Sequence, residues 1–488
     1  MNNKISLCAI GIIAIIVINL IGCAGAPAKP DFAKVNYDTA VSYMNSGDYQ
    51  KAIGLFNESL NLKSDNAKAY YNLGVCYEKT NNDKKAIELY TQALGIEPNY
   101  YEPQANLAPL YAKSGDDKKA IETYKELLKL KPDESQPNFE LGKLLEKIQM
   151  DRDAINAYKE AVRISPDLAD AHYNLGVLYT KAGDDKNAME AYKMVLKYKP
   201  DHFEATYALA MAFRKTGDNK SALEYYKKTV ELKKDFAKAY FEMGNICRDL
   251  SDGAAELEAY ANAACLEPDN YETQNNMAAA ALRIGDNQKA MAAFTEVFRL
   301  KPENSYASFI LADLCAQSGN MGQAIKFYEE TIKLKPDNAE AIYNLGTLYL
   351  NSGDNPKALE TYQNAIKVNP KYAQAQYGIG FIHSKMGENQ KAISAFQEAV
   401  KAKPDYEQAY YMMGAAYTKI LNYQRAIESF QSALKAKPDF AEAHLGLGLA
   451  YAYSGDSDNA NSEVKILAEK NKDMADKLQQ KIDALDKE

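Results

Sequence analysis

The chain has 488 residues, of which 25% are charged, and a formal net charge of −8. A single compact core rarely reaches this length, so we expect a modular architecture. The mild acidity argues against a nucleic-acid-binding protein, because binding phosphates requires a basic face.

Residues 1–22 have the pattern of a secretory signal. Lys4 is followed by a run of aliphatic residues and then by small residues. The end of the run, Leu20–Cys23 (LIGC), resembles the lipobox of bacterial lipoproteins. The resemblance implies cleavage before Cys23 and attachment of a diacylglycerol to its thiol, so that 1–22 would be a lipoprotein signal peptide. The alternative is an uncleaved membrane anchor.

Both interpretations place the rest of the chain outside the cytoplasm, because Lys4 favours a cytoplasmic N-terminus. Ala24, and not an aspartate, follows the cysteine. Resemblance to lipoproteins of enteric bacteria then favours the outer membrane. Residues 23–32 would be a lipid-anchored tether, at most ~33 Å long. We therefore expect a membrane-anchored lipoprotein that faces the periplasm or the cell exterior.

A small residue recurs every 34 residues along the chain, which indicates tandem repeats. The small residues are Ala40, Gly74, Ala108, Gly142, Gly176, Ala210, Gly244, Ala278, Ala312, Gly346, Gly380, Gly414 and Gly448. No insertion breaks the register from Ala33 to Met474. The sequence therefore predicts thirteen repeats over 33–474.

Each repeat predicts two helices. In the stretch AHYNLGVLYTK from Ala171, apolar residues three and four apart give the first helix one buried face. Gly183 would end that helix in the left-handed conformation, and Asp184 would cap the second helix. Pro200 lies where the second helix should stop. A repeat alone leaves an apolar face uncovered, so neighbouring repeats must stack.

These spacings resemble those of the tetratricopeptide repeat. The residues that carry the resemblance in one repeat are Leu175, Gly176, Tyr179, Ala188, Tyr192 and Pro200. The resemblance implies an all-α, right-handed superhelical solenoid of helix–turn–helix repeats, with a concave groove lined by the first helices. Residues 475–488 place Leu478, Ile482 and Leu485 on one face, as a C-terminal capping helix would.

An asparagine row is the first candidate binding site in this groove. It consists of Asn72, Asn106, Asn174, Asn276 and Asn344. A side-chain amide offers both a donor and an acceptor, so such a row can bind the backbone of an extended peptide. The row resembles the asparagine ladder of O-linked N-acetylglucosamine transferase. It is incomplete, and the residues at the same place in the other repeats are Glu140, Ala208, Glu242, Ile310, Gly378, Met412 and Gly446. Alternatively, asparagine is simply common at this position of the repeat.

A tyrosine row directly before these positions is the second candidate. It consists of Tyr71, Tyr173, Tyr207, Tyr343, Tyr377 and Tyr411. Tyrosine offers amphipathic contact area at a low entropic cost, and its ring can also stack on sugars. Alternatively, the tyrosines only fill the repeat consensus.

Two charge features need a structural explanation. Glu256 stands where other repeats have alanine, so either the helix shifts to bury Ala255 or Glu256 finds a partner. The next two repeats have Ala281 and Cys315 where tyrosine is usual, so repeats seven to nine are a candidate bend or special binding site. Lysines such as Lys181 and Lys215 end the first helices, as the helix dipole favours.

No catalytic constellation or metal-ligand cluster is visible, and nothing calls for a cofactor. The leading hypothesis is a non-enzymatic scaffold, anchored to the membrane through Cys23. It would bind partner proteins or peptides in the groove during envelope, secretion or pilus assembly, and no nucleic acid. The alternative is a polysaccharide-binding module of an exopolysaccharide synthesis or export system.

Overall fold

The computed structural model describes residues 31–485. Its 27 elements are all α-helices, and no strand occurs in this range. The prediction of an all-α chain of helix–turn–helix repeats is therefore confirmed. The predicted signal peptide, Cys23 and most of the tether lie outside the described residues. None of the helices between residues 31 and 485 combines the length and the apolar character that crossing a bilayer requires.

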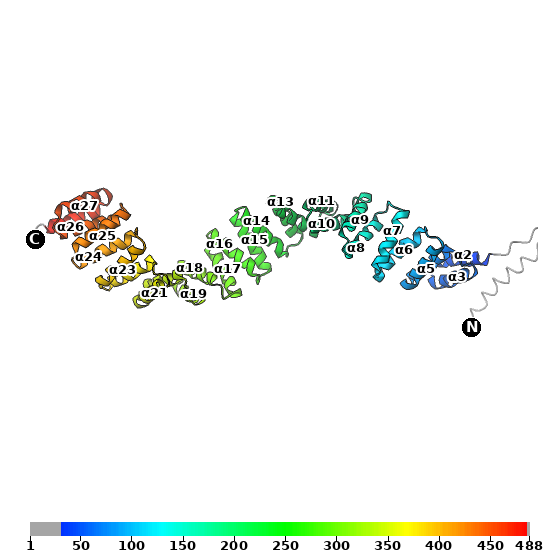
Figure 1. The fold of residues 1–488 in the computed structure, drawn as a ribbon, viewed down its shortest axis with the longest axis horizontal. Helices are drawn as coiled ribbons and strands as arrows, with labels where there is room; N and C mark the ends of the chain where they lie inside the picture. The colour runs from blue at the N-terminus through cyan, green and yellow to red at the C-terminus, as the bar shows by residue number, and fades with distance from the viewer. Residues whose placement is uncertain (1–30, 486–488) are drawn as a thin grey trace, which may run out of the picture. The chain divides into compact units, whose positions relative to one another are not determined.

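The chain divides into two compact units, one up to Lys228 and one from Thr229. Within a repeat the first helix packs on the second, as α10 does on α11 and α14 on α15 (Figure 1). The helices that begin before residue 229 are α2 Phe32–Asn45, α3 Tyr49–Leu62, α4 Ala67–Lys79, α5 Asp83–Ile96, α6 Tyr101–Ser114, α7 Asp117–Leu130, α8 Ser135–Lys147, α9 Asp151–Ile164, α10 Ala169–Ala182, α11 Asp185–Tyr198, α12 Phe203–Lys215 and α13 Asn219–Leu232.

The same alternation continues in the second unit. Its helices are α14 Ala237–Asp249, α15 Gly253–Leu266, α16 Tyr271–Arg283, α17 Asn287–Leu300, α18 Ser305–Gln317, α19 Met321–Leu334, α20 Ala339–Asn351, α21 Asn355–Val368, α22 Ala373–Lys385, α23 Asn389–Ala402, α24 Glu407–Lys419, α25 Tyr423–Ala436, α26 Ala441–Tyr453, α27 Ser457–Lys470 and α28 Lys472–Leu485.

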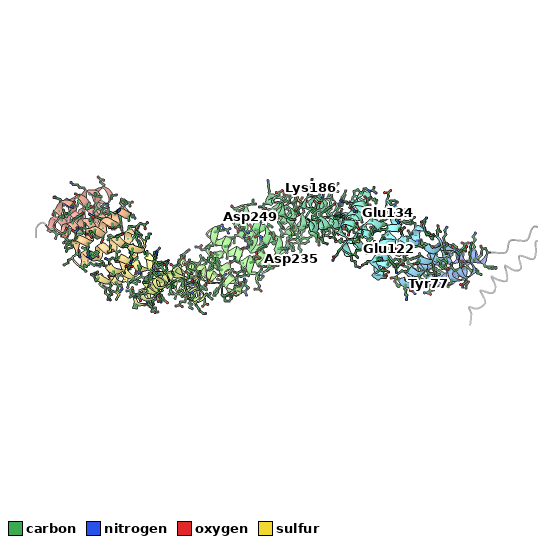
Figure 2. The ribbon with its side chains drawn as sticks, in the orientation of Figure 1. Tyr77, Glu122, Glu134, Lys186, Asp235 and Asp249 are labelled. Atoms are coloured by element: carbon green, nitrogen blue, oxygen red, sulfur yellow. The ribbon has the colours of Figure 1, made fainter. Side chains whose placement is uncertain are left out.

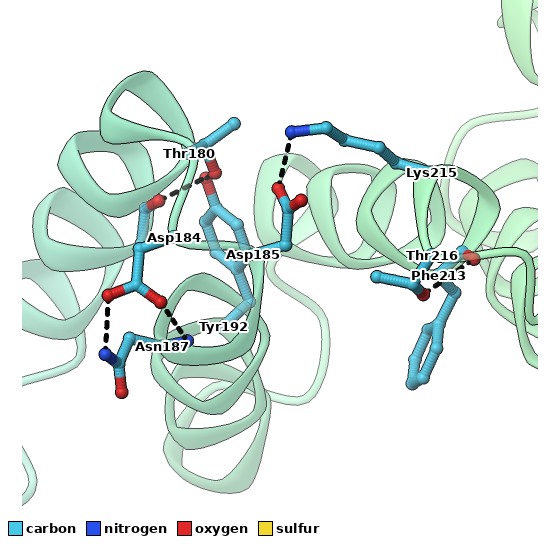
Figure 3. Close-up of polar contacts among 9 residues, drawn as sticks. Thr180, Asp184, Asp185, Asn187, Tyr192, Phe213, Lys215 and Thr216 are labelled. Atoms are coloured by element: carbon cyan, nitrogen blue, oxygen red, sulfur yellow. Dashed lines mark hydrogen bonds and ion pairs between the residues drawn. The ribbon is translucent and has the colours of Figure 1, made fainter.

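The turn inside each repeat follows from local chemistry. Gly183 ends α10 with a φ of 75°, in the left-handed region. The side chain of Asp184 then accepts the backbone N–H of Asn187 at 3.3 Å, which caps α11 (Figure 3). The Gly-Asp pair therefore stops one helix and starts the next within a few residues.

Leu421 occupies this turn in place of glycine, with a φ of 60° and 71% of its surface exposed. We expect Leu421→Gly to raise stability by about 1 kcal/mol, because the left-handed conformation costs a side-chain-bearing residue roughly 1–2 kcal/mol. Thermal unfolding followed by circular dichroism checks this. The matched control is Leu250→Gly, since Leu250 is also exposed but has a φ of −84°. A lower melting temperature for Leu421→Gly would contradict the assignment of strain.

The core is built from the small residue and the aromatic of each repeat. Gly176 lies so close to Tyr192 that a Cβ on it would come within 2.5 Å of the ring. Tyr192 is buried among Ala188, Val195 and Leu209. The repeated small residue is therefore a requirement of helix packing.

The last helix, α28, covers the end of the second unit. It starts at Lys472, slightly before the predicted residue 475. Ala475, Leu478 and Ile482 are buried and form a cluster with residues of α26 and α27. A helix with one apolar face thus covers the surface that a further repeat would otherwise bury.

Candidate functional site

The predicted asparagine and tyrosine rows lie in the middle of the first helices. We call the surface formed by these two rows the first-helix face. In the second unit the first helices contact one another directly, α20 with α22, α22 with α24 and α24 with α26. The first-helix face is therefore continuous from α20 to α26.

Four of the five asparagines bind the preceding repeat. In each case the side-chain amide Nδ2 donates to an oxygen of that repeat. The bonds run from Asn72 to Tyr37 at 3.0 Å, from Asn106 to Tyr90 at 3.1 Å, from Asn174 to Tyr158 at 3.0 Å and from Asn344 to the Asp313 carboxylate at 3.4 Å. These donors join neighbouring repeats, so the row cannot offer all of its groups to a peptide.

Two of the three tyrosines that receive these bonds are themselves held by carboxylates. The hydroxyl of Tyr158 donates to Glu146 at 2.8 Å, and that of Tyr90 donates to Glu78 at 2.7 Å. Burial, together with the hydrogen bond to a carboxylate, raises the pKa of both tyrosines above the ordinary value. The hydroxyls therefore stay protonated at neutral pH. Of the Asn174 amide, the carbonyl oxygen and the second N–H are left for a ligand.

Asn276 differs from the other four. It makes no hydrogen bond with any residue in the described range. In the preceding repeat the hydroxyl of Tyr260 donates to Asn245 at 2.8 Å. Here Asn245 takes the place of the carboxylate that accepts the tyrosine hydroxyl in other repeats. The inter-repeat bond of the following asparagine is absent in the same place.

Asn174→Ala is expected to lower the stability of α9 and α10 by about 1 kcal/mol, the usual net value of one hydrogen bond. Native-state hydrogen exchange of the amides in these helices measures the change, with α22 as an internal reference. Asn276→Ala is the matched control, because it removes an amide that bonds nothing. Equal loss of protection in the two variants would show that the inter-repeat bond of Asn174 contributes nothing.

The tyrosines of the second unit are half-buried between two aromatic rings each. One ring comes from the second helix of the same repeat and the other from the start of the next repeat. The distances between ring centres are 5.6 and 5.3 Å from Tyr343 to Tyr362 and Tyr372, 5.7 and 5.2 Å from Tyr377 to Phe396 and Tyr406, and 5.8 and 5.2 Å from Tyr411 to Phe430 and Phe440. The predicted row is thus part of a larger aromatic layer.

The tyrosines of the first unit have similar neighbours. The distances between ring centres are 5.8 and 5.5 Å from Tyr71 to Tyr90 and Tyr100, 6.1 and 5.0 Å from Tyr173 to Tyr192 and His202, and 5.9 Å from Tyr207 to Tyr226. The consensus role as packing residues therefore applies in both units.

Three aromatic residues of this layer were not among the sequence candidates. Tyr372, Tyr406 and Phe440 directly precede α22, α24 and α26. Their own spacing of 34 residues was the available signal. They contact the rings of Tyr343, Tyr377 and Tyr411 from one side, and so fix the orientation of these rings.

The hydroxyls of Tyr343, Tyr377 and Tyr411 make no hydrogen bond with any other residue between 31 and 485. Burial raises the pKa of Tyr377 and Tyr411, so these hydroxyls are protonated at neutral pH. Packing thus accounts for the rings, but it leaves three donors without a partner.

The lysines at the ends of the first helices have a role that the helix-dipole argument missed. Four of them pair with an aspartate at the start of the second helix one repeat earlier, as Lys215 does with Asp185 (Figure 3). The pairs are Lys113–Asp83 at 2.6 Å, Lys147–Asp117 at 2.8 Å, Lys181–Asp151 at 2.6 Å and Lys215–Asp185 at 2.7 Å. Their constant separation of 30 residues was readable in the sequence. Exposed pairs of this kind contribute little energy each.

Glu256 is buried, and Arg283 on α16 pairs with it. Of the two predicted alternatives, the partner is therefore correct, and Ala255 is not the fully buried residue. The pair with Arg283 therefore accounts for Glu256. A separate hollow of about 230 Å³, lined by Phe241, Asn270 and Thr273 among others, lies where repeats seven and eight meet.

Many other charged side chains lie outward, as Glu122 and Lys186 do on the first unit (Figure 2), whereas Glu463 is buried and bonds the ring of His444 at 2.6 Å. Among residues 31–485 no group of three or more His, Cys, Asp or Glu side chains could hold a metal ion. The site that this part of the chain offers is a surface of rings, hydroxyls and amides.

Protein-family models match the sequence in successive segments. Models described as tetratricopeptide repeat or TPR repeat match residues 40–81, 67–100, 84–138, 152–183, 169–202, 188–235, 207–273, 275–339, 343–407 and 422–455. No curated protein sequence matches the chain significantly.

Solved structures of other proteins are also similar to the chain. The crystal structure of MamA protein is 29% identical over 36% of this chain and 96% of its own, with a TM-score of 0.33. YrrB, described as a TPR protein with an unusual peptide-binding site, is 21% identical over 38% and 96%, with a TM-score of 0.34. A chain of the APC/C hetero-tetramer Cut9-Hcn1 is 16% identical over 94% and 97%, with a TM-score of 0.35. At such TM-scores none of them carries a function over to this chain.

Proposed function

Because the chain belongs to the tetratricopeptide repeat family, we propose that it is a non-enzymatic scaffold that binds extended segments of partner proteins on the first-helix face. The observation that supports this is the set of unpartnered hydroxyls of Tyr343, Tyr377 and Tyr411 on a continuous face. Packing alone would be satisfied by phenylalanine at these positions.

The chemistry of this surface suits a peptide. The tyrosine hydroxyls donate to peptide carbonyls, and the ring edges bury apolar side chains at a low entropic cost. In the first unit the free carbonyl oxygen of Asn174 accepts a peptide N–H. A polysaccharide is the weaker candidate, because Tyr372 and Tyr406 already contact the rings of Tyr343 and Tyr377, where a sugar would stack.

The proposed scaffold acts in the cell envelope, attached through a lipid on Cys23. Support for this comes from the LIGC sequence at Leu20–Cys23. Two or three acyl chains would give stable attachment to the membrane, and the outer membrane is favoured where the organism has one. Envelope, secretion or pilus assembly would supply the partners. Metabolic labelling with a fatty-acid analogue tests the anchor, and a Cys23→Ser chain that is still labelled would refute it.

Capture of envelope proteins on the purified chain tests the scaffold. The triple variant Tyr343→Phe, Tyr377→Phe, Tyr411→Phe keeps the rings and removes the hydroxyls, so each partner should bind several-fold more weakly per lost hydrogen bond. Tyr453→Phe is the control, because that tyrosine is exposed at the end of α26 and is not a member of the row. Recovery of no protein by the wild-type chain contradicts the scaffold, and retention of secreted polymer instead would favour the polysaccharide alternative.

A further inference from the structure

A hollow of about 200 Å³ opens between α24 and α26 on the first-helix face. Tyr411, Leu445 and Leu449 line it, and Gly446 lies directly over the Phe430 ring, which a Cβ would approach within 2.6 Å. A water molecule takes a share of only ~30 Å³ in the liquid. The hollow is therefore large enough for one large apolar side chain.

Two small residues create this hollow. Ala415 lines it, whereas the equivalent residue one repeat earlier is Phe381, whose ring stacks on Tyr377 at 6.3 Å. Gly446 likewise stands where the preceding repeat has Met412. The repeat consensus does not require a hollow here, because the neighbouring repeat fills the same place with its own side chains.

The hollow also has a charged residue in its wall. Glu442 is exposed, lines the hollow and forms no ion pair with any described residue. The Nζ of the nearby Lys437 lies 5.4 Å from the centre of the Phe440 ring and makes no ion pair with Glu442. An apolar cavity beside an unpaired carboxylate complements an apolar side chain next to a positive charge.

Resting on the scaffold function above, we propose that this hollow is the anchor site for one large aliphatic or aromatic residue of the partner segment, with a neighbouring lysine or arginine paired to Glu442. The hydroxyl of Tyr411 donates to the backbone of the same segment. A sugar fits less well, because Leu445 and Leu449 would leave most of its hydroxyls unpaired, and Glu442 offers acceptors in one part of the wall only.

Panning a displayed library of random peptides on the full chain tests the anchor. The expected result is enrichment of peptides in which a large apolar residue adjoins lysine or arginine. Ala415→Phe fills the hollow as Phe381 does, and should weaken these peptides on the order of tenfold, as loss of a central anchor does. Glu442→Lys should exchange the preferred neighbour for aspartate or glutamate, and it leaves a folded chain because Glu442 is exposed.

Gln408→Lys is the matched control, since it places the same charge at the equivalent position one repeat earlier. Peptides that bind equally to wild type and Ala415→Phe would overturn the anchor and leave the scaffold standing. The same holds if Gln408→Lys changes the preferred neighbour as Glu442→Lys does. Enrichment of no peptide on the wild-type chain would overturn both proposals.

Discussion

Gly176→Val is expected to lower the stability of the repeat that contains α10 and α11 by about 3 kcal/mol, at the upper end for overpacked cores. A Cβ at Gly176 would lie 2.5 to 2.8 Å from three atoms of the Tyr192 ring. That ring is buried, and its hydroxyl bonds Thr180 at 3.2 Å, so it cannot move freely (Figure 3). Valine adds two further methyl groups to the clash.

Hydrogen exchange of α10 and α11 amides measures the loss, because repeat arrays need not unfold in a single step. Gly54→Val is the matched control, since a Cβ on Gly54 in α3 meets nothing within 4 Å. It should be neutral or slightly stabilising, because valine has a higher helix propensity than glycine. Similar losses in both variants would mean that propensity, not the Tyr192 contact, decides the choice of glycine.

Gly176→Ala should have a smaller effect. Alanine stands at the equivalent positions Ala108 and Ala312, opposite Tyr124 and Tyr328, so the architecture tolerates one methyl group once the ring has shifted. The gain in helix propensity of about 1 kcal/mol offsets part of the clash. The restriction to Gly or Ala across the repeats follows from this balance.

The repeat architecture was predictable because its signals are local and recur in most copies. Gly183 and Asp184 end one helix and begin the next through backbone geometry and one capping bond. Gly176 and Tyr192 meet inside the same repeat, so their spacing is fixed by two helices and one turn. Thirteen copies of such signals specify helix pairs without knowledge of any distant contact.

The role of the asparagines was not predictable, since it depends on which oxygen lies across a repeat boundary. Asn174 finds the hydroxyl of Tyr158, whereas Asn276 finds no bond although it occupies the same position. The hollow beside Glu442 was hidden for a similar reason. It depends on the joint volumes of Ala415 and Gly446, which lie on different helices.

Arg283→Ala is expected to destabilise α15 and α16 by about 2–3 kcal/mol, because it leaves a buried carboxylate unpaired. The Glu256 side chain is only 2% exposed, and Arg283 is its ion-pair partner. The loss should fall below the ~3–5 kcal/mol of fully buried pairs, since the Arg283 side chain is 51% exposed and water reaches the site from its side. Hydrogen exchange of α15 amides checks the effect.

Glu256→Ala should instead be neutral or stabilising, because it restores the alanine that other repeats carry, such as Ala290. The double variant should then match Glu256→Ala, which would place the whole cost of Arg283→Ala on the stranded charge. Arg299→Ala is the control: Arg299 is 52% exposed like Arg283, but its partners Asp269 and Glu296 are exposed too, so its loss should stay within ~1 kcal/mol. If Arg283→Ala costs no more than Arg299→Ala, water already solvates Glu256, and the pair is not what permits a carboxylate in the core.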